Sequence, residues 1–173
     1  IGFVDERGLP LRLINIANVE QTLDLWTGEL RSVFTWKGEL VEVSTVAATV
    51  GDGIAVKMRS RAIAKGALKV RVAFPRGHDG KVKNNPALDW SEPKTHTTML
   101  TGSRLSGKWA VQRVRDGFRY GMALDVTKEA MLLETGEAHA LELRGKPGIE
   151  MLELAGRFAP GEAPGAVQTW AEA

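Results

Sequence analysis

The chain has 173 residues, of which 43% are apolar and 25% are charged, and its 23 Lys and Arg outnumber its 21 Asp and Glu by two. The length suits one domain, and the basic residues are scattered, which excludes the concentrated basic surface of a nucleic-acid-binding protein. There is no cysteine, which excludes disulfides and thiol chemistry, and no apolar run approaches the roughly 18 residues of a membrane helix.

Short apolar stretches separated by polar turns occupy the first part of the chain. Ile1–Val4 and Leu9–Ile16 flank a polar turn and predict two strands. Glu29–Trp36 and Glu39–Val46 flank a Lys-Gly pair, and the second of them mostly alternates apolar and polar residues, many of them β-branched. This arrangement predicts a β-hairpin.

A period of two is clearest in the middle of the chain. Ile54–Ser60 and Leu68–Phe74 carry apolar residues at every second position, which predicts strands with one buried and one solvated face. Lys108–Arg115 and Phe118–Val126 are joined by Asp116-Gly117. This dipeptide favours a type I′ turn, in which both central residues need positive φ.

Three further strands are expected at Glu129–Glu134, Ala138–Arg144 and Ile149–Phe158. With them, roughly ten to twelve short strands follow one another at intervals of about 8–12 residues, which is typical of an all-β sandwich or barrel. We expect a β-sandwich domain over residues 1–158. A Pro- and Gly-rich linker and the start of a helical region are expected over residues 159–173.

The segment Pro75–His96 is the longest stretch without apolar periodicity. A long loop inside a compact domain is usually functional or disordered, and this one contains two of the three histidines and a tryptophan. The spacing of His78, His96 and His139 matches no metal-ligand motif. We therefore expect isolated histidines and no metal site.

The motifs that would indicate catalysis are incomplete. Gly102–Lys108 fits the first seven positions of a phosphate-binding loop, but Trp109 stands where Ser or Thr should hold magnesium, and a strand follows instead of a helix. Ser91 and Lys94 have the spacing of a serine acyl-enzyme motif, but Pro93 forbids the helix that it needs. No carboxylate pair stands out as in a glycosidase. We expect neither a catalytic residue nor a cofactor in this chain.

Two tryptophans lie in polar, turn-rich segments. Trp26 precedes a Thr-Gly pair, and Trp90 follows Asp89. An indole in such a setting suits stacking on a sugar ring, whose hydroxyls then bind the polar neighbours; the alternative is that each tryptophan anchors its loop on the core. The candidate residues for substrate binding or interdomain contact are Trp26, Asp89, Trp90 and His96.

Five segments occur in an order and spacing that resemble a known family. They are Val19–Leu30, Val41–Val46, Ile54–Met58, Leu68–Pro75 and Asp89–Thr98. Together they resemble the N-terminal β-sandwich region of six-hairpin glycoside hydrolases related to the maltose phosphorylase and trehalase group. The resemblance implies an antiparallel supersandwich, similar to galactose mutarotase and incomplete at its N-terminus. It also implies that a separate (α/α)6 barrel carries the catalytic carboxylates.

The function implied by this resemblance is that of a non-catalytic domain in a glycoside hydrolase or phosphorylase. The domain would pack on the helical catalytic domain and lend the Pro75–His96 loop to its sugar site. One departure is Ala47–Gly53, where the family would have a more polar, proline-containing turn.

Two alternatives remain open. One is a free-standing carbohydrate-binding module, and the other is a mutarotase-like sugar enzyme with His96 or His78 as general acid. A carbohydrate ligand suits each of these hypotheses, whereas no nucleic-acid or membrane partner is expected. The absence of cysteine and of glycosylation sequons fits several compartments, with a secreted or periplasmic location slightly favoured over the cytoplasm.

Overall fold

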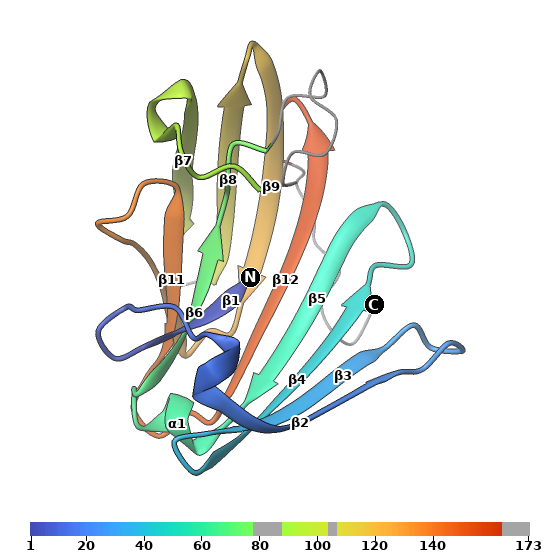
Figure 1. Ribbon diagram of the computed structural model, residues 1–173. Helices are drawn as coiled ribbons and strands as arrows, with labels where there is room; N and C mark the ends of the chain where they lie inside the picture. Colours follow the sequence, from blue (N-terminus) through green and yellow to red (C-terminus); the bar gives the residue numbers. More distant parts are fainter. Residues whose placement is uncertain (78–87, 104–106, 164–173) are drawn as a thin grey trace.

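Within the part of the chain that the structure describes, twelve strands form two antiparallel sheets (Figure 1). The structure is a computed structural model that describes residues 1–77, 88–103 and 107–163. The strands are β1 Gly2–Asp5, β2 Ile16–Leu23, β3 Leu30–Trp36, β4 Glu39–Ala47, β5 Asp52–Arg59, β6 Leu68–Ala73, β7 His96–Ser103, β8 Lys108–Arg115, β9 Phe118–Val126, β10 Ala130–Glu134, β11 Ala140–Gly145 and β12 Met151–Pro160.

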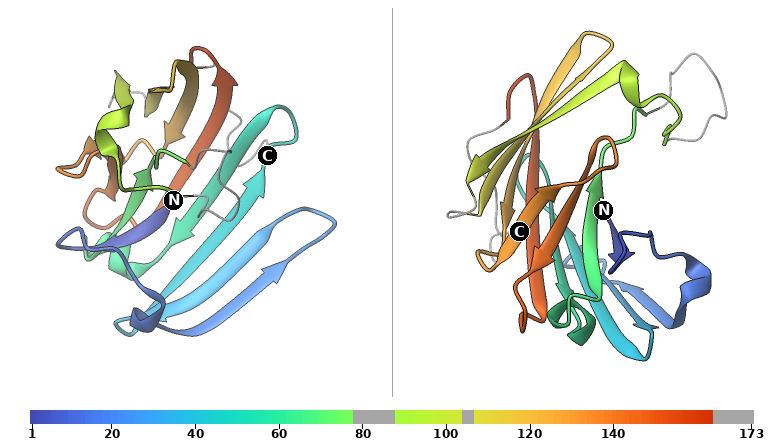
Figure 2. Two further views of the ribbon diagram at one scale, coloured as in Figure 1. Left: turned by 45° about the horizontal axis from the view of Figure 1, so that its top comes forward. Right: turned by 90° about the vertical axis from the view of Figure 1, so that its left-hand side faces the viewer.

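The two sheets differ in size. The larger has eight strands in the order β2-β3-β4-β5-β12-β9-β8-β7, and the smaller has four in the order β1-β6-β11-β10. They lie face to face as two layers (Figure 2). The predicted all-β antiparallel sandwich is confirmed.

The core lies between the sheets because each strand turns every second side chain inward. On β6 these are Leu68, Val70 and Val72, and the larger sheet contributes residues such as Met58 and Leu154. Burial of one such side chain stabilises the fold by about 1.5–3 kcal/mol. The opposite side chains of β6 and β11 form the outer face of the small sheet.

The tight hairpin turns form where the sequence predicts them. Asp116 and Gly117 have φ of 49° and 81°, and Lys37 and Gly38 have φ of 48° and 80°. Both pairs therefore show the positive φ values that a type I′ turn requires. The predicted β3–β4 and β8–β9 hairpins are confirmed.

Helices are short. The described residues contain one α-helix, α1, at Arg61–Ala64, and two 3-10 helices, η1 at Leu13–Asn15 and η2 at Pro93–Thr95. Ser60 caps α1 because its hydroxyl accepts a hydrogen bond from the Ala62 amide. Over the part of the chain that the structure describes, no helix combines the length and the apolar character that a membrane crossing needs.

The strand predicted for Leu9–Ile16 is wrong. Pro10 makes a single bridge to Val4, and the chain then turns through η1. A strand at Ile16–Leu23, which the periodicity does not indicate, forms instead as the edge of the large sheet. Nearly all of its side chains are exposed, so its two faces have no reason to differ in polarity. A register shift between Ala17 and Glu20 also interrupts any alternation.

The chain leaves the sandwich across the outer face of the large sheet. β12 continues to Pro160, past the domain end expected at residue 158. Gln112 Nε2 then donates a 2.7 Å hydrogen bond to the carbonyl of Gly161. At Gly121 a Cβ atom would overlap the backbone of Ala163. Residues 164–173, in which the helical start is expected, lie outside the described residues.

This close approach predicts that Gly121→Ala destabilises the protein. The added methyl group must displace the exit segment, and overpacking of this kind costs about 1–3 kcal/mol. Urea denaturation would measure the loss. The matched control is Gly136→Ala, where a Cβ would meet no atom within 4 Å. Equal unfolding midpoints for the two variants would contradict the packing described for Gly121.

Candidate functional site

Both ends of the loop Pro75–His96 are attached to one buried arginine. Arg113 lies on β8 with its side chain turned inward, and it is 1% exposed. Its Nη2 donates to the carbonyl of Pro75 at 3.0 Å, and its Nη1 donates to His96 Nδ1 at 2.9 Å and to the hydroxyl of Thr98. A single guanidinium therefore fixes the base of the loop.

Neutral groups surround this guanidinium. Its Nε donates to Tyr120 Oη at 3.1 Å, and the rings of Phe74 and Tyr120 lie 5.4 and 5.9 Å from its central carbon. No carboxylate of the described residues forms an ion pair with Arg113. A buried charge without a counter-ion is costly unless its donors are satisfied. The hydrogen bonds at the loop base supply the acceptors.

Two histidine rings stack next to Arg113. The centroids of His96 and His139 are 3.8 Å apart. His139 Nε2 lies 2.6 Å from the carbonyl oxygen of Pro93, which can only accept, so Nε2 carries the hydrogen. His139 Nδ1 then accepts from the hydroxyl of Thr98 at 2.9 Å. These contacts assign a directed hydrogen-bond chain from Arg113 through Thr98 and His139 to Pro93.

His96 is uncharged at neutral pH. Burial of the ring lowers its pKa to about 4, and the positive charge of Arg113 acts in the same direction. Its Nδ1 accepts from Arg113, which places the ring hydrogen on Nε2. A general acid works best when its pKa is close to the operating pH. This environment does not suit His96 to the acid role in a mutarotase-like enzyme, and His78, the other candidate, lies outside the described residues.

The expectation of isolated histidines is wrong for His96 and His139. His139 has a φ of 60°, which is uncommon for a residue other than glycine, and its carbonyl accepts from the Phe74 amide at 3.0 Å. It therefore joins the β10–β11 turn to the loop base. Over the described part of the chain, no three His, Asp or Glu side chains are grouped so that they could hold a metal ion.

Asp89 and Trp90 lie where the loop returns towards β7. The Asp89 carbonyl accepts from the Arg76 amide at 2.9 Å. Its carboxylate accepts from the Ser91 hydroxyl and amide, which together with the charge of Arg76 lower the pKa of Asp89. Trp90 is 47% exposed, and its ring lies 5.0 Å from the guanidinium carbon of Arg71. The indole is therefore supported from one side and accessible to solvent.

Trp26 lies apart from these residues, at the tip of the β2–β3 hairpin. The hairpin projects from the opposite side of the molecule to β7 (Figures 1 and 2). Asp24 stabilises the turn by accepting from the Trp26 amide at 2.8 Å, and the indole is 99% exposed. Trp26 is one of six exposed apolar residues that lie on β2 or in the segments next to its two ends, here together called the β2 edge patch: Leu13, Ile14, Val19, Leu23, Leu25 and Trp26.

The structure thus brings Asp89, Trp90 and His96 to the returning end of one loop and leaves Trp26 outside it. Arg113 is not among the candidate residues from the sequence, and His139 is considered there only as an isolated histidine outside any metal-ligand motif. Arg113 occupies an inward position of β8, where the period of two predicts an apolar residue. A charged residue at such a position departs from the pattern and could have been singled out as a candidate for this reason. No local signal marks His139, because its contacts come from segments more than 40 residues away in the sequence.

Comparisons with known proteins support the fold. No protein-family model matches the chain, and no curated protein matches it. Among solved structures, it is similar to one described as "Putative kojibiose phosphorylase from human microbiome", with a TM-score of 0.55 and 11% sequence identity. The alignment covers 92% of this chain and 21% of that chain. The chain therefore spans about a fifth of that protein and shares the fold of the matched region.

We predict that His96 makes stability depend on pH. The unfolded chain protonates this histidine near its ordinary pKa of 6.5, whereas the folded protein resists protonation down to about 4. The unfolded state therefore binds more protons between these values. The free energy of unfolding should fall as the pH is lowered from 6.5 to 4, by up to about 1.4 kcal/mol per pH unit. Urea denaturation across this pH range would measure it.

The control for this prediction is His96→Asn, which keeps an acceptor near the Nδ1 position and removes the titrating group. The variant should lose most of the pH slope that the natural protein shows between 6.5 and 4. Comparison of the two proteins cancels the contributions of the other histidines and of the carboxylates. An unchanged slope in the variant would mean that His96 is not the group that titrates.

Proposed function

We propose that this chain is a non-catalytic β-sandwich domain of a glycoside hydrolase-like enzyme, and that it packs on a helical catalytic domain of the same protein. The observation that carries the proposal is the likeness to a kojibiose phosphorylase, which covers nearly all of this chain and only 21% of the other. The matched region is therefore about a fifth of a longer protein, and we propose that the chemistry of the parent protein resides in a part that this chain does not contain.

The β2 edge patch supports the proposal as a packing surface. Leu25 and Trp26 are 85% and 99% exposed at the hairpin tip, and Leu13 and Ile14 are 85% and 87% exposed at the other end of β2. Single exposed apolar residues are normal, but six of them along one edge strand and its flanking segments favour an interaction surface there. A tryptophan at the end of a defined turn is also the kind of side chain that dominates protein interfaces.

We also propose that the Pro75–His96 loop contributes to the sugar site of the parent protein, and the fixed base of the loop supports this. Arg113 and His139 hold the two ends of the loop, so that Asp89 and Trp90 occupy defined positions near the end of β7. A polar loop on a rigid scaffold is a common carrier of binding residues. We propose that the half-exposed indole of Trp90 and the carboxylate of Asp89 face the neighbouring domain.

A free-standing carbohydrate-binding module is the second candidate. The indole of Trp90, supported by Arg71, accessible to solvent and next to Asp89, favours it. A free-standing module has no partner domain and therefore needs a sugar-binding platform of its own. The β2 edge patch favours the first candidate, because a free-standing module would leave these six apolar side chains in water.

The proposal predicts that Leu25→Ser combined with Trp26→Ser weakens domain packing in the full parent protein. The double variant should lower the thermal unfolding midpoint and raise hydrogen exchange in the helical domain, because the interface loses its apolar anchors. In the isolated chain the same change should alter the free energy of unfolding by no more than about 0.5 kcal/mol, since both side chains are exposed.

The matched control is Phe118→Ser. Phe118 is also a large apolar residue at a hairpin turn, and it is 78% exposed, but it lies outside the β2 edge patch. Phe118→Ser should change neither the thermal unfolding midpoint and hydrogen exchange of the parent protein nor the free energy of unfolding of the isolated chain. If the double variant and the control behave alike in the parent protein, the β2 edge patch is not a domain interface.

A further inference from the structure

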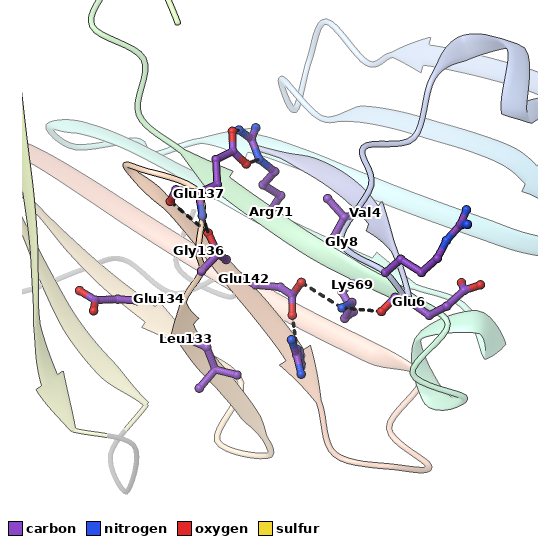
Figure 3. A pocket seen from close by; sticks show the side chains of 13 residues that line it. Val4, Glu6, Gly8, Lys69, Arg71, Leu133, Glu134, Gly136, Glu137 and Glu142 are labelled. Carbon is purple, nitrogen blue, oxygen red and sulfur yellow. Dashed lines mark hydrogen bonds and ion pairs between the residues drawn. The ribbon is translucent and has the colours of Figure 1, made fainter. Parts of the chain in front are cut away.

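A pocket of about 460 Å³ lies on the outer face of the four-stranded sheet (Figure 3). Its floor is formed by side chains of β6 and β11 that point away from the core, and its walls are the turns at residues 6–8 and 134–137. Pockets of about 300–1,000 Å³ commonly take small molecules. None of the candidate residues from the sequence lines this pocket.

A buried ion pair forms the floor. Lys69 Nζ lies 3.0 Å from Glu142 Oε2, and the two side chains are 8% and 6% exposed. Arg144 Nε donates to the other oxygen of Glu142, and Lys69 Nζ also donates to the carbonyl of Glu6 at 3.1 Å. Figure 3 shows the Glu142 carboxylate pointing towards the ammonium group of Lys69. Such a pair is expensive to desolvate, and the packed core on the other face of the sheet does not require it.

The floor has hydrogen-bonding capacity to spare. An ammonium group has three hydrogens, and among the described residues Lys69 has two acceptors. The terminal nitrogens of Arg144 have no acceptor in the described part of the chain, and this side chain is 47% exposed. Each oxygen of Glu142 accepts one of these bonds and has a second lone pair. Donors and acceptors therefore face the pocket together.

The lining as a whole has no net charge. Four of its side chains are carboxylates and four are Lys or Arg, while Val4 and Leu133 add apolar contacts. A ligand with a net charge would meet as many like charges as opposite ones. A neutral ligand with many hydroxyl groups uses both the donors and the acceptors, and its C–H groups suit the apolar contacts.

We propose that this pocket binds a neutral sugar through Lys69, Glu142 and Arg144. The choice of sugars among neutral polyhydroxyl compounds rests on the proposed function. Arg71 connects the pocket to the loop, because it lines the pocket, pairs with Glu137 and lies under the Trp90 ring at 5.0 Å. A sugar chain longer than the pocket would leave it past Arg71 towards Trp90.

The test is calorimetric titration of this chain with glucose and with glucose disaccharides, alongside glucuronate and glucosamine as charged analogues. We expect a neutral sugar to bind. In NMR spectra of the chain, the same sugar should shift the amide resonances of Glu142 and Gly136. Arg144→Gln should weaken this binding by about tenfold or more, because a charged hydrogen-bond donor is lost. Arg31→Gln is the matched control, since Arg31 is also an exposed arginine paired with a glutamate, on the other sheet.

A second variant blocks the pocket without touching its charges. Gly136→Trp should abolish binding, because residue 136 forms part of the wall and a Cβ there meets no atom within 4 Å, so the fold can accept it. Retained binding in both variants would overturn the proposal. The proposal would also be overturned if Trp90→Ala abolished binding while Arg144→Gln left it unchanged. The same holds if only the charged analogues bound, or if no neutral sugar bound. Because the titration needs no partner domain, its failure would leave the packing test of the proposed function untouched.

Discussion

The four-stranded sheet is too small to cover the whole inner face of the eight-stranded sheet. The small sheet buries its apolar face on the middle of the large sheet, and that contact forms the core. The large sheet therefore has an end on each side where no opposing strand among residues 1–77, 88–103 and 107–163 supplies apolar contacts. A strand at such an end still turns every second side chain inward. These inward side chains must find packing or hydrogen-bond partners outside the small sheet, or remain exposed to solvent. The two ends of this sandwich meet that requirement in different ways.

At the β7–β8 end, polar groups take the place of the missing strand. Arg113 occupies an inward position of the sheet, and the loop base and the β10–β11 turn close over it with carbonyls, hydroxyls and stacked histidine rings. The same contacts that satisfy the guanidinium also position the Pro75–His96 loop. At the β2 end nothing among the described residues closes the surface, and the side chains of the β2 edge patch remain exposed. The sandwich thus combines a loop whose described ends are held by hydrogen bonds with an apolar edge.

The outer face of the small sheet adds a third feature, because its ion pairs connect to the loop. Arg71 lies between Glu137 on one side and Trp90 on the other, so the pocket wall and the tryptophan share one guanidinium. The buried pair Lys69–Glu142 lies beside it on the adjacent strand positions. The proposed sugar site and the loop proposed to face the catalytic domain therefore contact the same side chain, Arg71.

The sequence by itself determined the strands whose two faces differ in environment. β5, β6 and β8 were predictable because apolar and polar residues alternate along them. β9 was predictable as the return strand after Asp116-Gly117, because a glycine-containing hairpin turn of this kind requires positive φ whatever surrounds it. β2 was not predictable, because an edge strand exposed on both faces carries no periodic signal. Tertiary structure alone decided the sites. The contact of His96 with His139, and the pairing of Lys69 with Glu142, join residues more than 40 positions apart, and only the order of strands in the sheets brings such residues within bonding distance.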